Sequence, residues 1–392
     1  MKMLRIPLIV LAFYLSIVGA FAQEDSIVYQ PRKLKVEEVN FVSSYYHQDG
    51  NNAAVTGGVG SERLTDVATT LDLKLARTDF RGRQHAYTFE IGLDTYSSAS
   101  SDKIDPSTLT SASYSDQRIY PSIAWSRYDS KKGTMVGANV SVSAEYDYLS
   151  IGGGINAYKD SGDKSRQLGL RVQTYQDAVS LIYPIEQRAG KNRGTETRKT
   201  YSATWSYSQI VNRRLQILFL IDLAVQKGFL SMPFNRVYFS DNTIGIENLP
   251  SSRFKFPASV RVNYFVGDNL IIRSFYRYYQ DDWGLKSHTA ELELPVKFTP
   301  FLSVSPFYRY YNQTSADYFA GKGSHLAGTE FYTSDYDLSK FESHFAGASL
   351  RLISADGILG VRKFDTVELR YGYYNRQTGL VSNIISLHAK FK

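Results

Sequence analysis

The sequence predicts an all-β fold: a transmembrane, antiparallel, up-and-down β-barrel of about 16 strands, with short periplasmic turns and long extracellular loops. Three observations predict it. Apolar and polar residues alternate with a period of two from about residue 34 to the C-terminus, as in half-buried strands. Aromatic residues make up 14% of the chain, with 30 Tyr among them, and Tyr favours membrane interfaces. Short and long connections alternate along the chain, as they do in bacterial outer-membrane barrels.

The N-terminus has the three parts of a secretory signal peptide. Lys2 and Arg5 give it a positive start, residues 6–18 form an apolar run, and Ala20-Phe21-Ala22 ends in small residues. The apolar run is too short to span a bilayer comfortably. We therefore expect export and cleavage after Ala22, and the alternative is an uncleaved membrane anchor.

The expected organisation is a signal peptide at residues 1–22, a short periplasmic lead-in at 23–33 and a barrel at 34–392. The lead-in is too small to be the plug domain of an energised transporter. An exported barrel implies the outer membrane of a Gram-negative bacterium, with outer-membrane lipid and the barrel-assembly machinery as partners.

Composition excludes several classes of protein. The chain has no Cys, so it has no lipid-modified Cys, no disulfide, no thiolate nucleophile and no Cys-based metal site. The formal charge of +7 includes Lys2 and Arg5 and has no basic cluster, which argues against nucleic-acid binding. No segment after residue 22 has an apolar run long enough for a transmembrane helix.

The strands are predicted by stretches in which every second residue is apolar. The clearest contains Leu215, Ile217, Phe219, Ile221, Leu223 and Val225, interleaved with Gln216, Asp222 and Gln226. Similar stretches cover residues 67–75, 87–93, 256–264, 292–298 and 385–391. The last one places Phe391 next to the carboxyl end, and a near-terminal aromatic residue in an alternating strand is typical of what the barrel-assembly machinery engages.

The connections form two classes. The short ones are expected near residues 79–83, 130–133, 160–164, 212–214, 267–269, 299–301 and 354–362. Between them lie longer polar segments near residues 47–65, 97–115, 178–199, 227–253 and 314–341, with brief connections at 147–150, 281–286 and 375–380. An even number of strands with both chain ends on the periplasmic side gives this pattern.

Tyr residues gather where odd-numbered strands are expected to end at the cell surface. We interpret them as an aromatic girdle at the headgroup level, because Tyr is amphipathic. The strongest girdle candidates are Tyr276, Tyr278, Tyr308, Tyr310, Tyr371 and Tyr373. The alternative, aromatic residues inside a soluble sandwich, does not explain why they collect at one end of alternate strands.

If the apolar residues of each strand face lipid, the residues between them face the lumen. The charged lumen candidates are Lys255, Arg261, Arg273, Arg277, Glu291, Glu293, Lys297, Arg309, Arg351, Glu368 and Arg370. On the lipid face each charge would cost about 2–4 kcal/mol near the bilayer midplane. Two interpretations stay open: a net-basic wall that favours anions, or an Arg–Glu ladder that neutralises itself.

Catalytic and metal-binding motifs are weak. The chain has no Gly-x-Ser-x-Gly elbow, no His-Glu-x-x-His and no P-loop. Its six His are scattered without metal-ligand spacing. Residues 49–52 are better explained as a turn than as a calcium loop, and residues 57–60 follow a loop, which disfavours phosphate binding. We expect no catalytic residues, no cofactor and no metal, and no enzyme, although a rim active site stays possible.

Several of these segments resemble one known family. Residues 43–58 (SSYYHQDGNNAAVTGG) and 64–66 (LTD) are similar to the opening block of an outer-membrane barrel family catalogued as domain of unknown function 3570. Residues 94–102, 145–148, 276–283 and 371–380 fit the same pattern. The resemblance implies an outer-membrane barrel and no particular activity. As the first external loop, the opening block would either constrict the pore or cap the rim.

Three functions are consistent with the sequence. The first is a passive channel or transport barrel for small polar solutes, because barrels of about 16 strands can leave an aqueous channel. The second is a structural or docking barrel with a filled lumen that binds an envelope protein partner. The third is an outer-membrane hydrolase with a Ser/His or Asp/His cluster at its rim.

Overall fold

The computed structural model describes residues 33–97, 115–187 and 194–392. The expected signal peptide at 1–22 and, apart from Lys33, the expected lead-in at 23–33 lie outside these residues. Residues 34–392 form one compact unit. None of the described helices is both long and apolar enough to cross a membrane.

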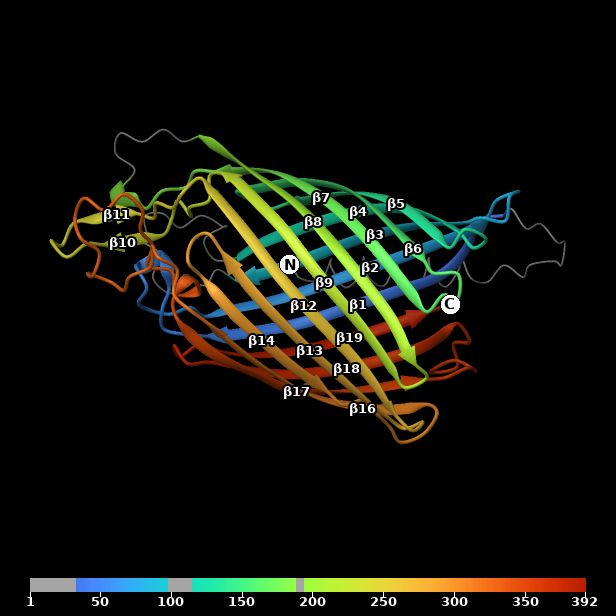
Figure 1. The fold of residues 1–392 in the computed structure, drawn as a ribbon. Coiled ribbons are helices and arrows are strands. Elements are labelled where there is room, and N and C mark those ends of the chain that lie inside the picture. Colours follow the sequence, from blue (N-terminus) through green and yellow to red (C-terminus); the bar gives the residue numbers. More distant parts are fainter. Residues whose placement is uncertain (1–32, 98–114, 188–193) are drawn as a thin grey trace, which may run out of the picture. The chain divides into compact units, whose positions relative to one another are not determined.

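One large antiparallel sheet contains almost all of the strands (Figure 1). Its strands are β1 (Lys35–Asp49), β2 (Leu64–Thr78), β3 (Gln84–Ser97), β4 (Ser115–Asp129), β5 (Thr134–Ala144), β6 (Tyr148–Asp160), β7 (Arg166–Ser180), β8 (Thr195–Asn212), β9 (Leu215–Gly228), β12 (Ser252–Val266), β13 (Leu270–Asp281), β14 (Lys286–Glu293), β15 (Val296–Lys297), β16 (Leu302–Gln313), β17 (Phe341–Ile353), β18 (Phe364–Arg376) and β19 (Val381–Phe391).

β14 and β15 are two pieces of a single strand, because both lie between β13 and β16. The break between them contains Pro295, which has no N–H to donate to a neighbouring strand. Counted in this way, the described residues form 16 strands in the sheet.

The sheet closes on itself. β1 pairs in register with β2 on one side and with β19 on the other, where Val39 lies opposite Phe391 and Asp49 opposite Val381. Every other strand of the sheet likewise has a neighbour on each side, so the barrel has no open edge that could pair with another chain. The strands tilt across the barrel, as closure requires (Figure 1). The predicted closed, antiparallel barrel of 16 strands is confirmed.

The outward face of the barrel is apolar. Ile123, Ile155 and Leu168 lie on it with 56%, 64% and 61% of their surface exposed. These residues alternate with inward-facing polar ones, so the period of two in the sequence corresponds to the two faces of a closed sheet. Side chains of this kind, exposed all around a barrel, need an apolar surrounding rather than water.

The longest connections all lie at one end of the barrel, together with three brief ones, and the other end has turns of ten residues or fewer. The end that we call the turn end has the connections 79–83, 130–133, 161–165, 213–214, 267–269, 298–301 and 354–363. The end that we call the loop end has the connections 50–63, 145–147, 229–251, 282–285, 314–340 and 377–380. β3 and β7 also end there, and β4 and β8 begin there. At the turn end, Asp79 accepts hydrogen bonds from the N–H groups of Arg81 and Arg83, and Gly82 adopts a φ of 75°. This local chemistry closes the turn.

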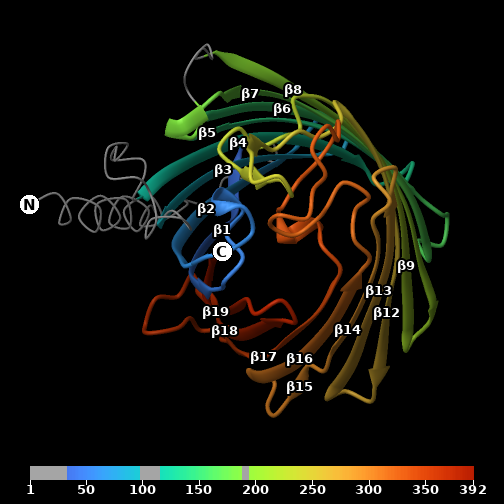
Figure 2. The same cartoon turned by 90° about the vertical axis from the view of Figure 1, so that its left-hand side faces the viewer.

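Three of the long connections pack together at the loop end. They are residues 50–63, which contain η1 (Ala54–Thr56), residues 229–251, which contain the hairpin β10 (Arg236–Tyr238) and β11 (Ile244–Ile246), and residues 314–340, which contain η5 (Tyr336–Leu338). We call them the loop cap. Figure 2 looks in from this end and shows these segments projecting over the barrel opening. A further short helix, η4 (Ile185–Gln187), lies in the connection after β7.

The loop cap has a small core of its own. Val237 and Thr333 are fully buried, and the ring of Phe239 contacts those of His325 and Tyr332. The first loop joins this core through two glycines with positive φ, Gly57 and Gly58. A Cβ on Gly57 would lie 2.4 Å from the Tyr238 ring, so only glycine permits this approach.

Candidate functional site

The inward face of β12–β19 contains all eleven charged lumen candidates. Arg261, Arg277, Glu291 and Arg309 line a cavity of about 790 Å³, which we call the larger cavity. Alternate residues of a strand point to the same face, and so do residues that lie opposite each other on neighbouring strands. By this rule the other seven candidates lie on the same inward face as the residues that line the cavity. We call this face the basic wall.

Only part of the basic wall neutralises itself. Arg273 lies 3.3 Å from Glu293, Arg309 lies 2.6 Å from Glu291, and Arg351 lies 3.9 Å from Glu368. Each pair is directly opposed across two neighbouring strands. The remaining five candidates have no carboxylate oxygen within 4.0 Å among the described residues: Lys255, Arg261, Arg277, Lys297 and Arg370.

Aromatic rings hold several of these arginines. The guanidinium carbon of Arg370 lies 4.0 Å from the ring centre of Phe307, and that of Arg261 lies 5.5 Å from Phe275. Cation–π contacts of this kind fix a guanidinium without neutralising its charge. The N–H groups therefore stay available to a negatively charged solute.

The opposite half of the barrel is acidic. A cavity of about 390 Å³ lies against the inward face of β3–β9, where Glu90 and Asp177 line it together with Arg118, Arg198 and several hydroxyl-bearing residues. The inward face of β2–β9, which we call the acidic wall, has eight carboxylates and four basic residues by the same alternation. The carboxylates are Asp66, Asp72, Glu90, Asp94, Asp116, Glu145 (just after β5), Asp177 and Asp222, and the basic residues are Lys74, Arg118, Arg171 and Arg198. The lumen thus lies between two walls of opposite sign. The sequence reasoning considered only the basic one.

The larger cavity has a buried arginine at its loop-cap side. Arg376, at the end of β18, has only 4% of its side chain exposed. Its Nη1 donates to Asp337 at 2.5 Å, and its Nη2 lies 3.8 Å from a carboxylate oxygen of Glu62. The guanidinium also lies 4.9 Å from the ring centre of Phe341. Arg376 therefore joins the barrel wall to both the first loop and the connection after β16.

The first loop is part of the cap and also reaches the lumen. Asn52 donates to the carbonyl of Thr378 at 2.7 Å, and Arg236 donates to the carbonyl of Val55 at the same distance. Glu62, near the end of this loop, lines the larger cavity. Burial raises the pKa of Glu62 despite the neighbouring Arg376.

Two further carboxyl groups lie inside the loop cap and form no ion pair within 4.0 Å among the described residues. Glu247 accepts hydrogen bonds from Met232 N–H at 2.6 Å and from the Thr333 hydroxyl at 2.5 Å, and burial raises its pKa. Burial, followed by the nearby charge of Asp337, raises the pKa of Asp335 to about 7. Both groups favour the protonated form more than exposed carboxyls do.

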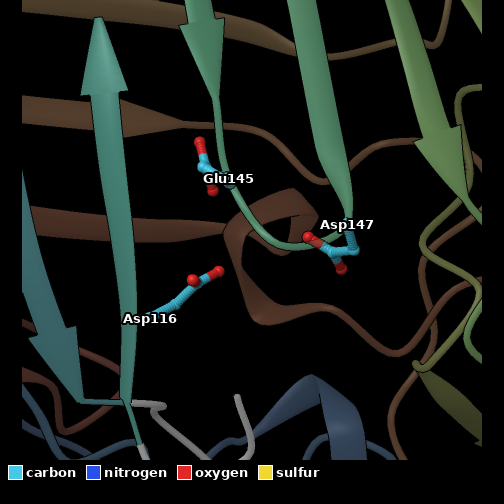
Figure 3. A group of neighbouring side chains, drawn as sticks. All are labelled: Asp116, Glu145 and Asp147. Atoms are coloured by element: carbon cyan, nitrogen blue, oxygen red, sulfur yellow. The ribbon is translucent and has the colours of Figure 1, made fainter.

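A group of three carboxylates lies at the loop end of the acidic wall. Asp116, Glu145 and Asp147 each offer an oxygen within 4.8 Å of the other two (Figure 3). Glu145 already accepts a hydrogen bond from the Tyr96 hydroxyl at 2.7 Å and lies 3.6 Å from Arg118. Burial raises the pKa of Asp147, and the charge of Asp116 raises it further. This cluster was not predicted from the sequence, because its members come from two separate segments.

The histidines have diverse partners. His85 lies 3.3 Å from Asp79, and His47 hydrogen-bonds with the Thr65 hydroxyl at 2.8 Å. His325 bonds with the carbonyl of Thr333, and His388 with Asn40. Within the described ranges, no His is hydrogen-bonded to a Ser hydroxyl.

The girdle candidates all lie on the outward face near the loop end, in a motif that occurs three times. The Tyr276 hydroxyl bonds with His288 at 2.7 Å, and the Tyr308 hydroxyl bonds with His344 at 2.7 Å. In the third hairpin the Tyr371 hydroxyl donates to Asn383 at 2.8 Å. The partner in each case lies opposite the second Tyr of its pair: Tyr278, Tyr310 and Tyr373. In each of these three hairpins the outward His or Asn thus has a Tyr partner.

The chain is similar to several solved outer-membrane structures. A bacterial polysaccharide outer membrane secretin is 11% identical, with 93% of this chain and 100% of that chain covered and a TM-score of 0.44. The outer membrane protein opdK from Pseudomonas aeruginosa is 8% identical, with 92% and 99% covered and a TM-score of 0.43. The ferric enterobactin receptor PfeA from the same organism, as a mutant, is 10% identical, with 86% and 53% covered and a TM-score of 0.47. Because these TM-scores are below 0.5, the barrel assignment depends on this chain's own strand pairing.

A search of curated proteins finds no match. A family model described as Protein of unknown function (DUF3570) matches residues 16–383.

Proposed function

This chain belongs to the family described as Protein of unknown function (DUF3570), and because that description names no activity, we propose a function from the lumen: an outer-membrane channel that admits small polar solutes between two oppositely charged walls. The loop end faces the cell surface, since short turns lie on the periplasmic side of such barrels. Export by a cleaved signal peptide, in a Gram-negative cell, is part of the same proposal.

The apolar outward face supports membrane insertion. Exposed side chains such as Val140 and Ile155, at 60% and 64%, would be costly in water and are favourable in hydrocarbon. The Tyr–His and Tyr–Asn pairs near the loop end fit the headgroup level, where amphipathic rings are favoured.

The observation that carries the proposal is the separation of charge across the lumen. Among the described residues, Arg261 and Arg277 on one side have no carboxylate within 4.0 Å, and Glu90 on the other side has no cation within 4.0 Å. Opposed charged walls generate a field across the pore, which orients a solute that has separated charges of its own. Because the two walls partly compensate each other, the channel has only a weak overall preference for cations or anions.

Purified protein in planar bilayers tests this proposal. We expect conductance with a small reversal potential under a salt gradient. The double variant Arg261→Gln/Arg277→Gln shifts the preference toward cations, and Glu90→Gln shifts it toward anions. A folded barrel with no conductance, or variants that shift selectivity in the same direction, would rule the proposal out.

A docking barrel is a second candidate, favoured by the packed loop cap. A cap with its own core, built on buried Val237 and Thr333, offers a fixed surface to an envelope protein partner. Shortening the 314–340 connection separates the two functions. In a channel the conductance rises, whereas in a docking barrel it does not change and a co-purifying partner is lost.

A further inference from the structure

We propose that the larger cavity is a binding site for a small organic monoanion: a solute with one carboxylate and an apolar, preferably aromatic, body. This inference rests on the proposed channel function and names the class of solute that the channel selects. It is carried by the arrangement of charged and apolar groups around the cavity.

The cationic part of the site is formed by Arg261 and Arg277. Both are exposed to the cavity that they line, and neither has a carboxylate within 4.0 Å among the described residues. Arg261 pairs with Phe275 across β12 and β13, so Arg277 lies diagonally adjacent to it on the same face. Long side chains at diagonal positions reach one another, so a single carboxylate can accept hydrogen bonds from both.

The other two arginines of the cavity are already engaged. Arg309 pairs with Glu291 at 2.6 Å, and Arg376 pairs with Asp337. The side chain of Arg376 is only 4% exposed, and its Nε and Nη2 atoms have no hydrogen-bond partner among the described residues. Both atoms are buried and Nη2 lies 3.8 Å from Glu62, so these donors are not accessible to a solute, and Arg261 and Arg277 are the arginines that bind it.

The apolar part of the site is formed by Phe341, Phe345, Leu380 and Ile384, which line the same cavity. An inorganic anion would leave this surface in contact with water. A ring attached to a carboxylate covers it and gains the corresponding hydrophobic free energy. A cavity of about 790 Å³ falls within the usual range for small-molecule sites.

Carboxylates around the cavity limit the charge of the solute. Glu62, Glu291 and Asp337 also line it, and each lies within 4.0 Å of one of the two engaged arginines. A second negative charge on the solute would be repelled by these groups. A monocarboxylate is therefore favoured over a phosphate dianion.

Calorimetric titration of the detergent-solubilised full barrel tests the site, with benzoate, acetate and inorganic phosphate as probes. We expect benzoate to bind more tightly than either acetate or phosphate. Arg261→Gln/Arg277→Gln weakens benzoate binding by about tenfold or more, as removal of charge-assisted hydrogen bonds predicts. The control is Lys297→Gln, which removes an unpaired lumen charge outside the cavity and leaves binding unchanged. Circular dichroism confirms that each variant is folded.

The inference fails if benzoate does not bind, if phosphate binds as tightly as benzoate, or if the two arginine substitutions have no larger effect than Lys297→Gln. Binding in detergent is independent of conductance. A conducting barrel that does not bind benzoate overturns this site alone, and a benzoate-binding barrel without conductance overturns the channel alone.

Discussion

The two walls of the lumen have opposite charges, and they also hold those charges in different ways. On the acidic wall, carboxylates accept hydrogen bonds from neighbours: Asp177 from Ser150 at 2.7 Å and from Arg198 at 2.9 Å, and Asp94 from Tyr120 at 2.9 Å. On the basic wall, arginines lie over phenyl rings instead, as Arg261 does over Phe275. Hydrogen-bonded carboxylates have their acceptor capacity partly filled, whereas stacked guanidinium groups keep their donors free.

This difference indicates where a solute finds an available charge. Asp177 has only 4% of its side chain exposed, whereas Arg309 has 45% exposed even though it is paired. The acidic wall is therefore largely satisfied within the protein, and the basic wall presents its charges to the lumen. The two walls thus differ in what they can bind.

Both walls also contain a strand glycine against which a large aromatic ring packs. On the acidic wall, Tyr175 covers Gly152, and on the basic wall Phe307 lies against Gly347. The space at Gly347 is tighter, because a Cβ there would lie 2.0 Å from the backbone oxygen of Tyr371. At Gly152 the nearest atoms, at 2.6–2.7 Å, belong to side chains that can move.

Of the substitutions that test this comparison, Gly347→Ala is expected to have the largest effect on the free energy of unfolding. Because backbone must shift to admit the methyl group, we expect a loss of about 3 kcal/mol in the free energy of unfolding. Gly152→Ala costs about 1–2 kcal/mol, since side chains absorb the strain. Gly153→Ala is the control: its Cβ meets nothing closer than 3.7 Å, and its unfolding free energy does not fall. Urea unfolding of the refolded barrel measures all three, and equal losses at the two lumen glycines would contradict the comparison.

The loop cap is joined to the basic wall at Arg376, which gives the second prediction. Arg376→Met removes the pair with Asp337 and leaves Glu62 without its nearby cation. Because Asp337 is 76% exposed and can be rehydrated, we expect the cap to be destabilised by only about 1–3 kcal/mol. Limited proteolysis of residues 314–340 should become roughly tenfold faster or more, with the barrel strands still resistant.

Arg273→Met is the matched control for that experiment. It removes an arginine of the same wall that is paired with Glu293 but does not line the larger cavity or contact the cap. Cleavage of residues 314–340 should be unchanged in this variant. If both substitutions accelerate cleavage equally, Arg376 does not hold the cap.

The third prediction concerns pH, to which the cap should respond between pH 5 and 8. The pKa of Asp335 is raised to about 7 from 3.8, and that of Glu247 is also raised. A carboxyl with a raised pKa in the folded state stabilises that state below its unfolded pKa, and this contribution is lost as the pH rises through the folded value. The cap should therefore be cleaved several-fold faster at pH 8 than at pH 5.5, measured with a protease active at both.

Asp335→Asn should remove most of this pH dependence, because the amide cannot ionise. Asp241→Asn is the control within the same cap. The pKa of Asp241 is lowered by its hydrogen bonds with Thr243, so its carboxylate is ionised across this range and its substitution leaves the pH dependence intact. If cleavage of the cap depends on pH equally in both variants, ionisation of Asp335 is not the cause of that dependence.

The sequence was sufficient for the barrel because alternation and turn chemistry are local. Stretches such as 215–225 identify which residues share a face, and the eleven lumen candidates all occupy inward positions. The polar partners in those stretches, Glu90 and Asp94 among them, contained the signal for the acidic wall as well. That signal was missed because the sequence does not say which strands lie across the lumen from one another until the sheet is closed.

The loop cap could not be predicted for a different reason. Its contacts join residues far apart in the chain, such as Arg236 with Val55 and Asn52 with Thr378. Apart from the short hairpin of β10 and β11, these segments have no strand periodicity, because their backbone packs against other loops rather than into the barrel sheet. Nothing in the sequence around Arg376 predicts that it is buried. Its burial depends on contacts with Asp337 and Phe341, which come from other parts of the chain.

The smallest expected effect compares one charge from each wall. Arg277→Gln removes an exposed, unpaired cation, and Asp177→Asn removes a buried carboxylate that is already hydrogen-bonded. Both change the lumen charge by one unit, but solvent ions sense the exposed group more strongly. We expect Arg277→Gln to lower the chloride-to-potassium permeability ratio by about twofold, and Asp177→Asn to raise it by clearly less. Reversal potentials at low salt measure both ratios. If Asp177→Asn has the larger effect, charge on the acidic wall is as available to solutes as charge on the basic wall, and the distinction between hydrogen-bonded and ring-stacked charges does not govern this lumen.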